Sequence, residues 1–156
     1  FKEWNQNEIK LMLEILSELP KWTEVESYNF SRATTSISKK NPATSELANK
    51  SIVFYDLFFK KKNKSSIIVH EASHHLYRKL NSQVIVEFLE LSGWTIQTTK
   101  DGKIFELPPK SSINPDSLIE KDEDFTNHIE SYFKNTKNYK LTHPKLYDFF
   151  QKRYPL

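Results

Sequence analysis

The run His70-Glu71-Ala72-Ser73-His74 constrains this chain more than any other feature of its sequence. It follows the apolar stretch Ile67-Ile68-Val69, and the apolar spacing around it predicts a helix that Ser65 or Ser66 caps. Four residues advance a helix by about 400°, so the two histidines point the same way and their imidazoles can share one cation. Burying two histidines and a glutamate in such a helix is costly without a partner, and a metal ion supplies that partner.

The chemistry of this run is that of a zinc site. Neutral imidazole binds Zn²⁺ well, so His70 and His74 are the predicted metal ligands. Glu71 is rotated by about 100° from the first histidine, which lets its carboxylate reach toward a metal-bound water and act as general base. The alternative is that the two histidines lie at the surface or at the edge of the core and that Glu71 is only solvated. His75 lies off the shared face and is expected to be a packing residue or to support a ligand.

Length and composition limit the class of protein. At 156 residues the chain has the size of one domain with its own core, so we predict a single domain over residues 1–156. The absence of cysteine excludes a disulfide framework and any thiolate metal site. No apolar run is long enough to span a bilayer, so we expect no membrane span. The chain begins at Phe1 rather than Met, so we expect it to be a fragment of a longer chain.

The periodicity of apolar residues predicts both helices and strands. Helices are expected over residues 3–19, 66–80, 83–91 and 121–135, with a last one that begins at residues 142–144. Strands are expected over residues 24–32 and 52–59, a loop over residues 33–49, and a hairpin that joins residues 94–99 to residues 103–107. Helices mixed with a small, mostly antiparallel sheet place the chain in the α+β class.

The densest positive charge is the run Lys60-Lys61-Lys62-Asn63-Lys64. Such a run can contact phosphates or an acidic partner, but a solvated loop between two apolar segments is the favoured interpretation. No basic face with interleaved aromatic residues accompanies it, so we expect no nucleic-acid binding.

Residues 120–133 form a candidate ligand-bearing helix. Projection at about 100° per residue places Glu123, Asn127 and Glu130 on one face and the aromatic and aliphatic side chains on the other. A catalytic zinc needs a third protein ligand, and the two carboxylates of this face are candidates. A plain amphipathic surface helix explains the same periodicity equally well.

The zinc motif, the later Glu123-Asp124-Phe125 and the helix that starts at His143-Pro144 together resemble gluzincin peptidases. The likeness is to the group that contains the anthrax lethal-factor catalytic domain, the Pro-Pro endopeptidases and the Mlc titration factor peptidase, and it runs from about residue 52 to the end of the chain. It implies a zincin-like fold and Glu123 as third zinc ligand, with Glu130 as the fallback. It also implies that Asn127 orients a zinc-bound histidine.

The sequence differs from the resembled family at one position. Relatives of this type often have a tyrosine about two turns before the ligand glutamate, proposed to stabilise the oxyanion, and residues 114–118 contain none. Tyr77, Tyr132 and Tyr139 are the candidate replacements. Loss of an oxyanion donor typically lowers the rate by about 10²–10³-fold, so slow turnover is compatible with this departure.

The predicted function is zinc-dependent hydrolysis of a peptide bond in a peptide or protein substrate. By resemblance, the strand over residues 52–59 would form the edge of the substrate cleft, while its two apolar faces favour a wholly buried core strand instead. The alternatives are a weak or inactive zincin-fold binding module and an interaction domain that uses Lys60–Lys64. Composition rich in lysine, asparagine and isoleucine favours a bacterial source, and the relatives suggest a toxin or effector module. Neither a cytoplasmic nor a secreted location is excluded, and the oligomeric state is left open.

Overall fold

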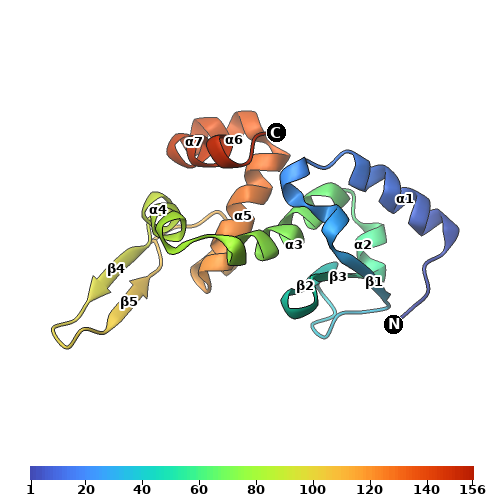
Figure 1. Ribbon diagram of the computed structural model, residues 1–156, viewed down its shortest axis with the longest axis horizontal. Coiled ribbons are helices and arrows are strands. Elements are labelled where there is room, and N and C mark those ends of the chain that lie inside the picture. The colour runs from blue at the N-terminus through green and yellow to red at the C-terminus, as the bar shows by residue number, and fades with distance from the viewer. The chain divides into compact units, whose positions relative to one another are not determined.

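The computed structural model describes residues 1–156, and in it the chain divides into two units (Figure 1). The first comprises residues 1–76 together with Leu156, and the second comprises residues 77–155. Each unit is described by itself. Helices predominate, and the strands form one small sheet and one hairpin, which confirms the predicted α+β class.

The sheet of the first unit has three strands in the order β1-β3-β2. Strand β1 (Asn29–Ala33) runs parallel to β3 (Ser51–Tyr55), while β2 (Ala43–Glu46) runs antiparallel to it. The sheet is therefore mixed, and the expectation of a mostly antiparallel sheet holds only for the β2–β3 pair and for the hairpin of the second unit.

Strand β3 is the centre of this sheet and is covered on both faces. Ile52, Val53 and Phe54 are all buried. Both edges of β3 are paired with neighbouring strands, so it cannot add an extended peptide. The expectation that residues 52–59 form the edge of a cleft is wrong, and the alternative of a buried core strand is confirmed.

The strand also ends earlier than its apolar run. Residues from Asp56 onward form the short helix α2 (Asp56–Lys60), whose Phe58 is completely buried. A short apolar run that is buried on all sides looks the same in sequence whether it forms a strand or a helical turn. Residues 61–63 of the lysine run form an exposed turn between α2 and the next helix, as the solvated-loop interpretation predicts.

Two other predicted segments differ from the structure for local reasons. The first part of the strand expected over residues 24–32 is instead the 3₁₀ turn η2 (Val25–Ser27), which follows another 3₁₀ turn, η1 (Lys21–Thr23). Glu24 between them has a left-handed backbone (φ +50°), which extended chain does not tolerate. The expected loop over residues 33–49 contains β2 and a third 3₁₀ turn, η3 (Leu47–Asn49).

Helix α1 (Gln6–Ser17) begins at a capping box formed by Asn5 and Glu8. Its buried stripe consists of Met12, Ile15 and the following Leu19, whereas Ile9 and Leu13 of the predicted stripe are exposed. Glu8 also accepts a hydrogen bond from the buried Arg32 of β1 at 2.9 Å, which ties α1 to the sheet.

Helix α3 (Lys64–Lys79) carries the histidine motif. It begins one residue before Ser65, so neither predicted serine is the cap, and Ser66 is buried in the first turn. Ile67, Ile68 and Ala72 are buried as the apolar spacing predicts.

The second unit is built around an aromatic core. Its helices are α4 (Ser82–Ser92), α5 (Lys121–Lys134), α6 (Thr136–Thr142) and α7 (Pro144–Arg153), and the 3₁₀ turn η4 (Pro115–Leu118) precedes α5. Phe88, Phe125 and Phe150 are completely buried, and their ring centroids lie 5.2 Å to 6.2 Å apart. Helix α6, which the sequence analysis did not anticipate, is capped by the side chain of Asn135. None of the helices of the chain is both long enough and apolar enough to cross a membrane.

A β-hairpin extends from this unit beyond its helices (Figure 1). Strands β4 (Thr95–Thr98) and β5 (Ile104–Leu107) pair antiparallel as predicted, and every residue of both strands is exposed. Gly93 ends α4 in a left-handed conformation (φ +92°), and a Cβ there would approach the Cβ of Pro109 to 3.3 Å. The position therefore needs glycine for both its backbone angle and its close packing.

Candidate metal centre

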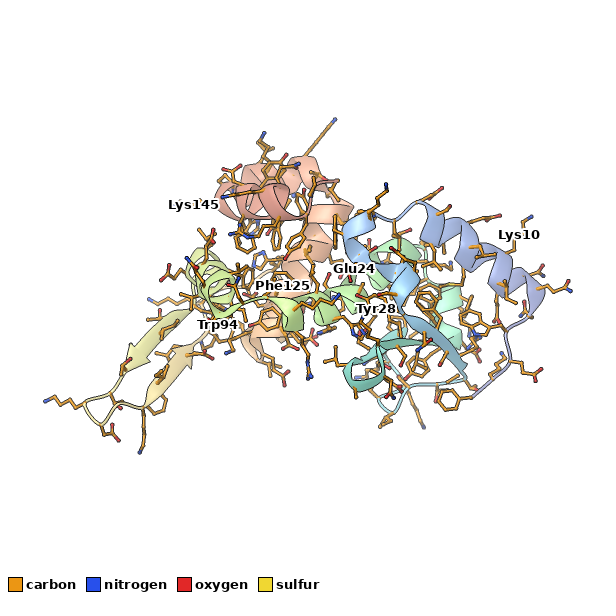
Figure 2. The ribbon with its side chains drawn as sticks, in the orientation of Figure 1. Lys10, Glu24, Tyr28, Trp94, Phe125 and Lys145 are labelled. Carbon is orange, nitrogen blue, oxygen red and sulfur yellow. The ribbon has the colours of Figure 1, made fainter.

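His70 and His74 lie one helical turn apart on α3, and their ring centroids are 5.2 Å apart. Both side chains are partly exposed, as expected for groups that meet a ligand. Their neighbour His75 is buried and stacks on Tyr28 with a centroid separation of 4.6 Å. Figure 2 labels Tyr28, which lies beside this helix in the first unit. His75 is thus a packing residue, as its position off the shared face predicts.

The histidine pair forms a potential metal-binding group with Glu123 of α5. Each of the three residues offers one ligand atom, and these atoms all lie within 4.8 Å of one another. Two imidazoles and a carboxylate are a donor set that suits zinc. Glu130, the fallback ligand, stands two turns further along α5 and is not part of this group.

Glu71 is buried, and a serine of the sheet holds its carboxylate. The hydroxyl of Ser45 on β2 lies 2.8 Å from Oε2 of Glu71 and 2.7 Å from the backbone carbonyl of the same residue. The hydroxyl has a single hydrogen, which it shares between these two acceptors, so the contact restricts both the position of the carboxylate and its rotation.

The first turn of α5 is anchored through the residue that follows Glu123. Asp124 is completely buried, and its Oδ2 accepts a hydrogen bond from the indole Nε1 of Trp94 at 3.0 Å. Its Oδ1 lies 3.6 Å from Nε2 of His128, whose Nδ1 is 2.8 Å from the hydroxyl of Tyr139. Figure 2 labels Trp94, together with Phe125, which follows Asp124 on α5. A chain of four polar groups therefore runs through the core of the second unit.

Burial dominates the ionisation of this chain of groups. It raises the pKa of Asp124, against the lowering effect of the hydrogen bond from Trp94. It lowers the pKa of His128 from 6.5 to about 3, with a further contribution from the nearby His143. Burial also raises the pKa of Tyr139. Each shift favours the neutral form of the group, as expected in a medium that solvates charge poorly.

Asn127 is held by residues of the turn before α5. Its Nδ2 donates to the hydroxyl of Ser117 at 3.0 Å, and its Oδ1 lies 3.4 Å from Nδ2 of Asn114. These contacts tie α5 to η4, the segment in which relatives of the resembled family often carry a tyrosine. The role predicted for Asn127, orientation of a zinc-bound histidine, remains a prediction.

The three candidate tyrosines have different surroundings. The hydroxyl of Tyr132 donates to Gln151 at 3.0 Å, and that of Tyr139 bonds His128, so both are engaged inside the second unit. Tyr77 is half-buried, and desolvation together with nearby carboxylates raises its pKa to about 12. Tyr77 is therefore the candidate whose hydroxyl is best placed to meet a ligand.

Two contributors to this region had no signal in the sequence. Ser45 belongs to a segment rich in serine and threonine that favours loop, and nothing local marks it as a partner of Glu71. The pairing of Trp94 with Asp124 joins residues 30 positions apart. A tryptophan that begins a predicted hairpin gives no indication of this partner.

Comparison of the chain with protein-family models, curated proteins and solved structures found no match. The chemistry of the site is therefore inferred from its own residues and geometry.

Proposed function

We propose that this chain is a zinc-dependent peptidase domain of the gluzincin type. The observation that carries the proposal is that His70, His74 and Glu123 offer ligand atoms within 4.8 Å of one another. Two histidines and a glutamate leave one position of a tetrahedral zinc open, which is the arrangement of catalytic rather than structural sites. When bound, zinc would supply Lewis acidity toward water and toward the carbonyl of the substrate.

Glu71 is the proposed general base. It follows the first ligand directly, and its Oε2 is held by the hydroxyl of Ser45, so the carboxylate is positioned to receive the proton of the attacking water. The same carboxyl group then gives this proton to the leaving amine, as a single positioned group does in acyl transfer. Ser45 is a positioning residue in this scheme, because its side chain touches the base and not the reacting bond.

The edge of strand β2 is the proposed binding place for the substrate backbone. The backbone N–H of Tyr55 donates to the carbonyl of Pro42, so in the alternating antiparallel ladder the backbone groups of Ala43 and Ser45 point away from β3. An extended peptide that pairs with these groups lies beside the serine that holds Glu71. Strand β2 thus replaces the buried β3 as the candidate cleft edge.

Substitution of Glu71 tests this function. We expect the wild-type protein to bind one equivalent of zinc and, once loaded, to cleave members of a peptide library. Glu71→Gln should retain zinc and lose cleavage by at least about 100-fold, because the base is removed and the ligands stay. Elemental analysis and fluorescent peptide cleavage measure the two properties. Failure of the wild-type protein to bind stoichiometric zinc would contradict the proposal.

A second candidate function is a zincin-like module that binds peptides without efficient turnover. The observation that favours it is the sequence of η4, which contains no tyrosine, together with the engagement of Tyr132 and Tyr139 in other hydrogen bonds. Zinc-loaded protein that binds peptides but cleaves none of them would identify this second function.

A further inference from the structure

The second unit contains a pocket of about 360 Å³ at the start of α5. Its lining includes two aromatic side chains, Tyr77 and Trp94, and the charged residues at the helix start, Glu120, Lys121 and Asp122. Glu120 is exposed to solvent.

The charge of this pocket is negative. Glu106 of the hairpin also lines it and forms an ion pair with Lys121 at 2.5 Å, so these two charges compensate each other. The lining thus contains three carboxylates, those of Glu106, Glu120 and Asp122, and one lysine. Glu120 occupies the cap position of α5 without making a side-chain capping hydrogen bond, so its carboxylate can turn toward a ligand.

The electrostatic surroundings of Tyr77 also favour a cation in this pocket. Beyond desolvation, the charges of Asp122, Glu106 and Asp124 raise the pKa of its phenol, because they disfavour a further negative charge at this place. A field that opposes a phenolate attracts a cation. Aromatic faces add to this attraction when a cationic side chain lies against them.

The pocket is adjacent along the chain to the proposed metal ligands. Tyr77 follows His74 by three residues on α3, and Asp122 immediately precedes Glu123 on α5. The indole that lines the pocket also donates to Asp124, the next residue of the same helical turn. A side chain in this pocket therefore contacts residues that are sequence neighbours of the proposed metal ligands.

We propose that the pocket binds a lysine or arginine side chain of the peptide substrate. The aliphatic stem would lie against Tyr77 and Trp94, and the cationic end would meet Glu120 and Asp122. This inference rests on the proposed peptidase function, which it extends by naming a basic residue next to the cleaved bond as the specificity determinant.

Binding of small probes tests the pocket without requiring turnover. The protein contains three tryptophans, so ¹⁵N-labelled protein should give three indole N–H signals. The Trp4→Phe and Trp22→Phe variants each remove one signal, and the remaining signal is that of Trp94. The probes are the N-acetyl methylamides of arginine, norleucine and glutamate. We expect the arginine probe to shift the Trp94 signal at lower concentration than the norleucine probe, with no response to the glutamate probe.

Glu120→Gln should weaken binding of the arginine probe by about three- to tenfold, because one carboxylate of the pocket is lost. The matched control Asp148→Asn removes an exposed carboxylate of α7 and should leave binding unchanged. Equal binding of the arginine and norleucine probes, or no effect of Glu120→Gln, would overturn the inference.

Cleavage of matched peptides separates this inference from the proposed function. The peptides differ only in carrying arginine, norleucine or glutamate at one of the positions beside the cleaved bond. At the position whose side chain enters the pocket, kcat/KM should be about tenfold higher for arginine than for glutamate. Glu120→Gln should reduce that ratio, and Asp148→Asn should not. Cleavage without any preference for a basic residue would overturn the inference and leave the peptidase proposal standing. Binding of the arginine probe without cleavage of any peptide would instead support the pocket and contradict the peptidase proposal.

Discussion

Helices α3 and α5 both carry polar residues in or near the core, but these residues differ in their exposure to solvent and in the side chains that hold them. On α3 the chemically important groups stand within five consecutive residues, and two of them, His70 and His74, remain partly exposed. On α5 the buried polar groups, Asp124, Asn127 and His128, are each held by a side chain from elsewhere in their unit.

The difference distinguishes the partly exposed histidines of the motif from buried residues that serve the fold. A buried polar group needs a partner, and that partner is either another part of the protein or something that binds to it. The partners of the α5 residues are tryptophan, serine and tyrosine side chains of the same unit. We therefore expect substitutions of Asp124, Asn127 and His128 to lower the stability of the protein, and substitutions on the motif of α3 or of Glu123 to lower its activity.

The largest effect on stability is expected at Asp124. Asp124→Ala removes the acceptor of the Trp94 indole and leaves a buried N–H without a partner, so the free energy of unfolding should fall by about 2–3 kcal/mol. Glu71→Gln should change it by less than about 1 kcal/mol. Denaturant unfolding of metal-free protein measures both, because bound zinc would add its own stabilisation.

Asp148→Ala, at an exposed position of α7, is the control for loss of a carboxylate and should be nearly neutral. If Asp124→Ala and Asp148→Ala proved equally mild, the buried chain of polar groups would not be the anchor of α5.

Acid should destabilise the second unit through His128. Its pKa is 6.5 in an unfolded chain and about 3 in the structure, so between these values the unfolded state binds a proton that the folded state does not. The free energy of unfolding therefore falls as the pH falls through this window, by up to about 1 kcal/mol per pH unit. Asp124, whose pKa is raised, opposes this trend in the acidic part of the window.

His128→Gln isolates the histidine contribution. Between about pH 6.5 and pH 4.5 the variant should lose stability less steeply with acid than the wild-type protein does. Parallel pH dependences in the two proteins would mean that His128 is protonated in the folded state.

The smallest effect is expected at Ser45, which supports the motif of α3 from outside. Ser45→Ala should lower kcat about tenfold and leave KM nearly unchanged, because it frees the carboxylate of Glu71 and touches no substrate side chain. Stability should change by less than about 1 kcal/mol. Ser45→Thr keeps the hydroxyl and should recover most of the rate, an outcome that a purely structural role of the serine does not predict.

Local signals in the sequence predicted much of the helical structure. Gly93 ends α4 and Pro144 starts α7, so each of these boundaries depends on one residue and its immediate neighbours. The spacing of His70 and His74 belongs to the same kind of information, since helix geometry alone brings the two rings to one face.

Features that depend on distant residues could not be predicted in this way. The apolar run that ends at Phe59 becomes helix α2 after Tyr55. Asp56, the first residue of this helix, forms an ion pair with Arg32 of β1, and the local sequence does not reveal this pairing. Strand β2 has only one buried residue, Ala43, so it lacks the apolar alternation that marks a strand. The contact between Ser45 and Glu71 depends on that strand and was hidden for the same reason.

The hairpin of the second unit has a consequence for sequence variation and for protein engineering. Its base is constrained at Gly93, where a side chain would meet Pro109, while at its tip a Cβ on Gly102 would meet no other atom. Natural relatives should therefore differ in the length and composition of residues 99–103 while they keep the glycine at the base. The same tip is a suitable place to insert a peptide tag or a fluorophore, because no core residue lies in its strands.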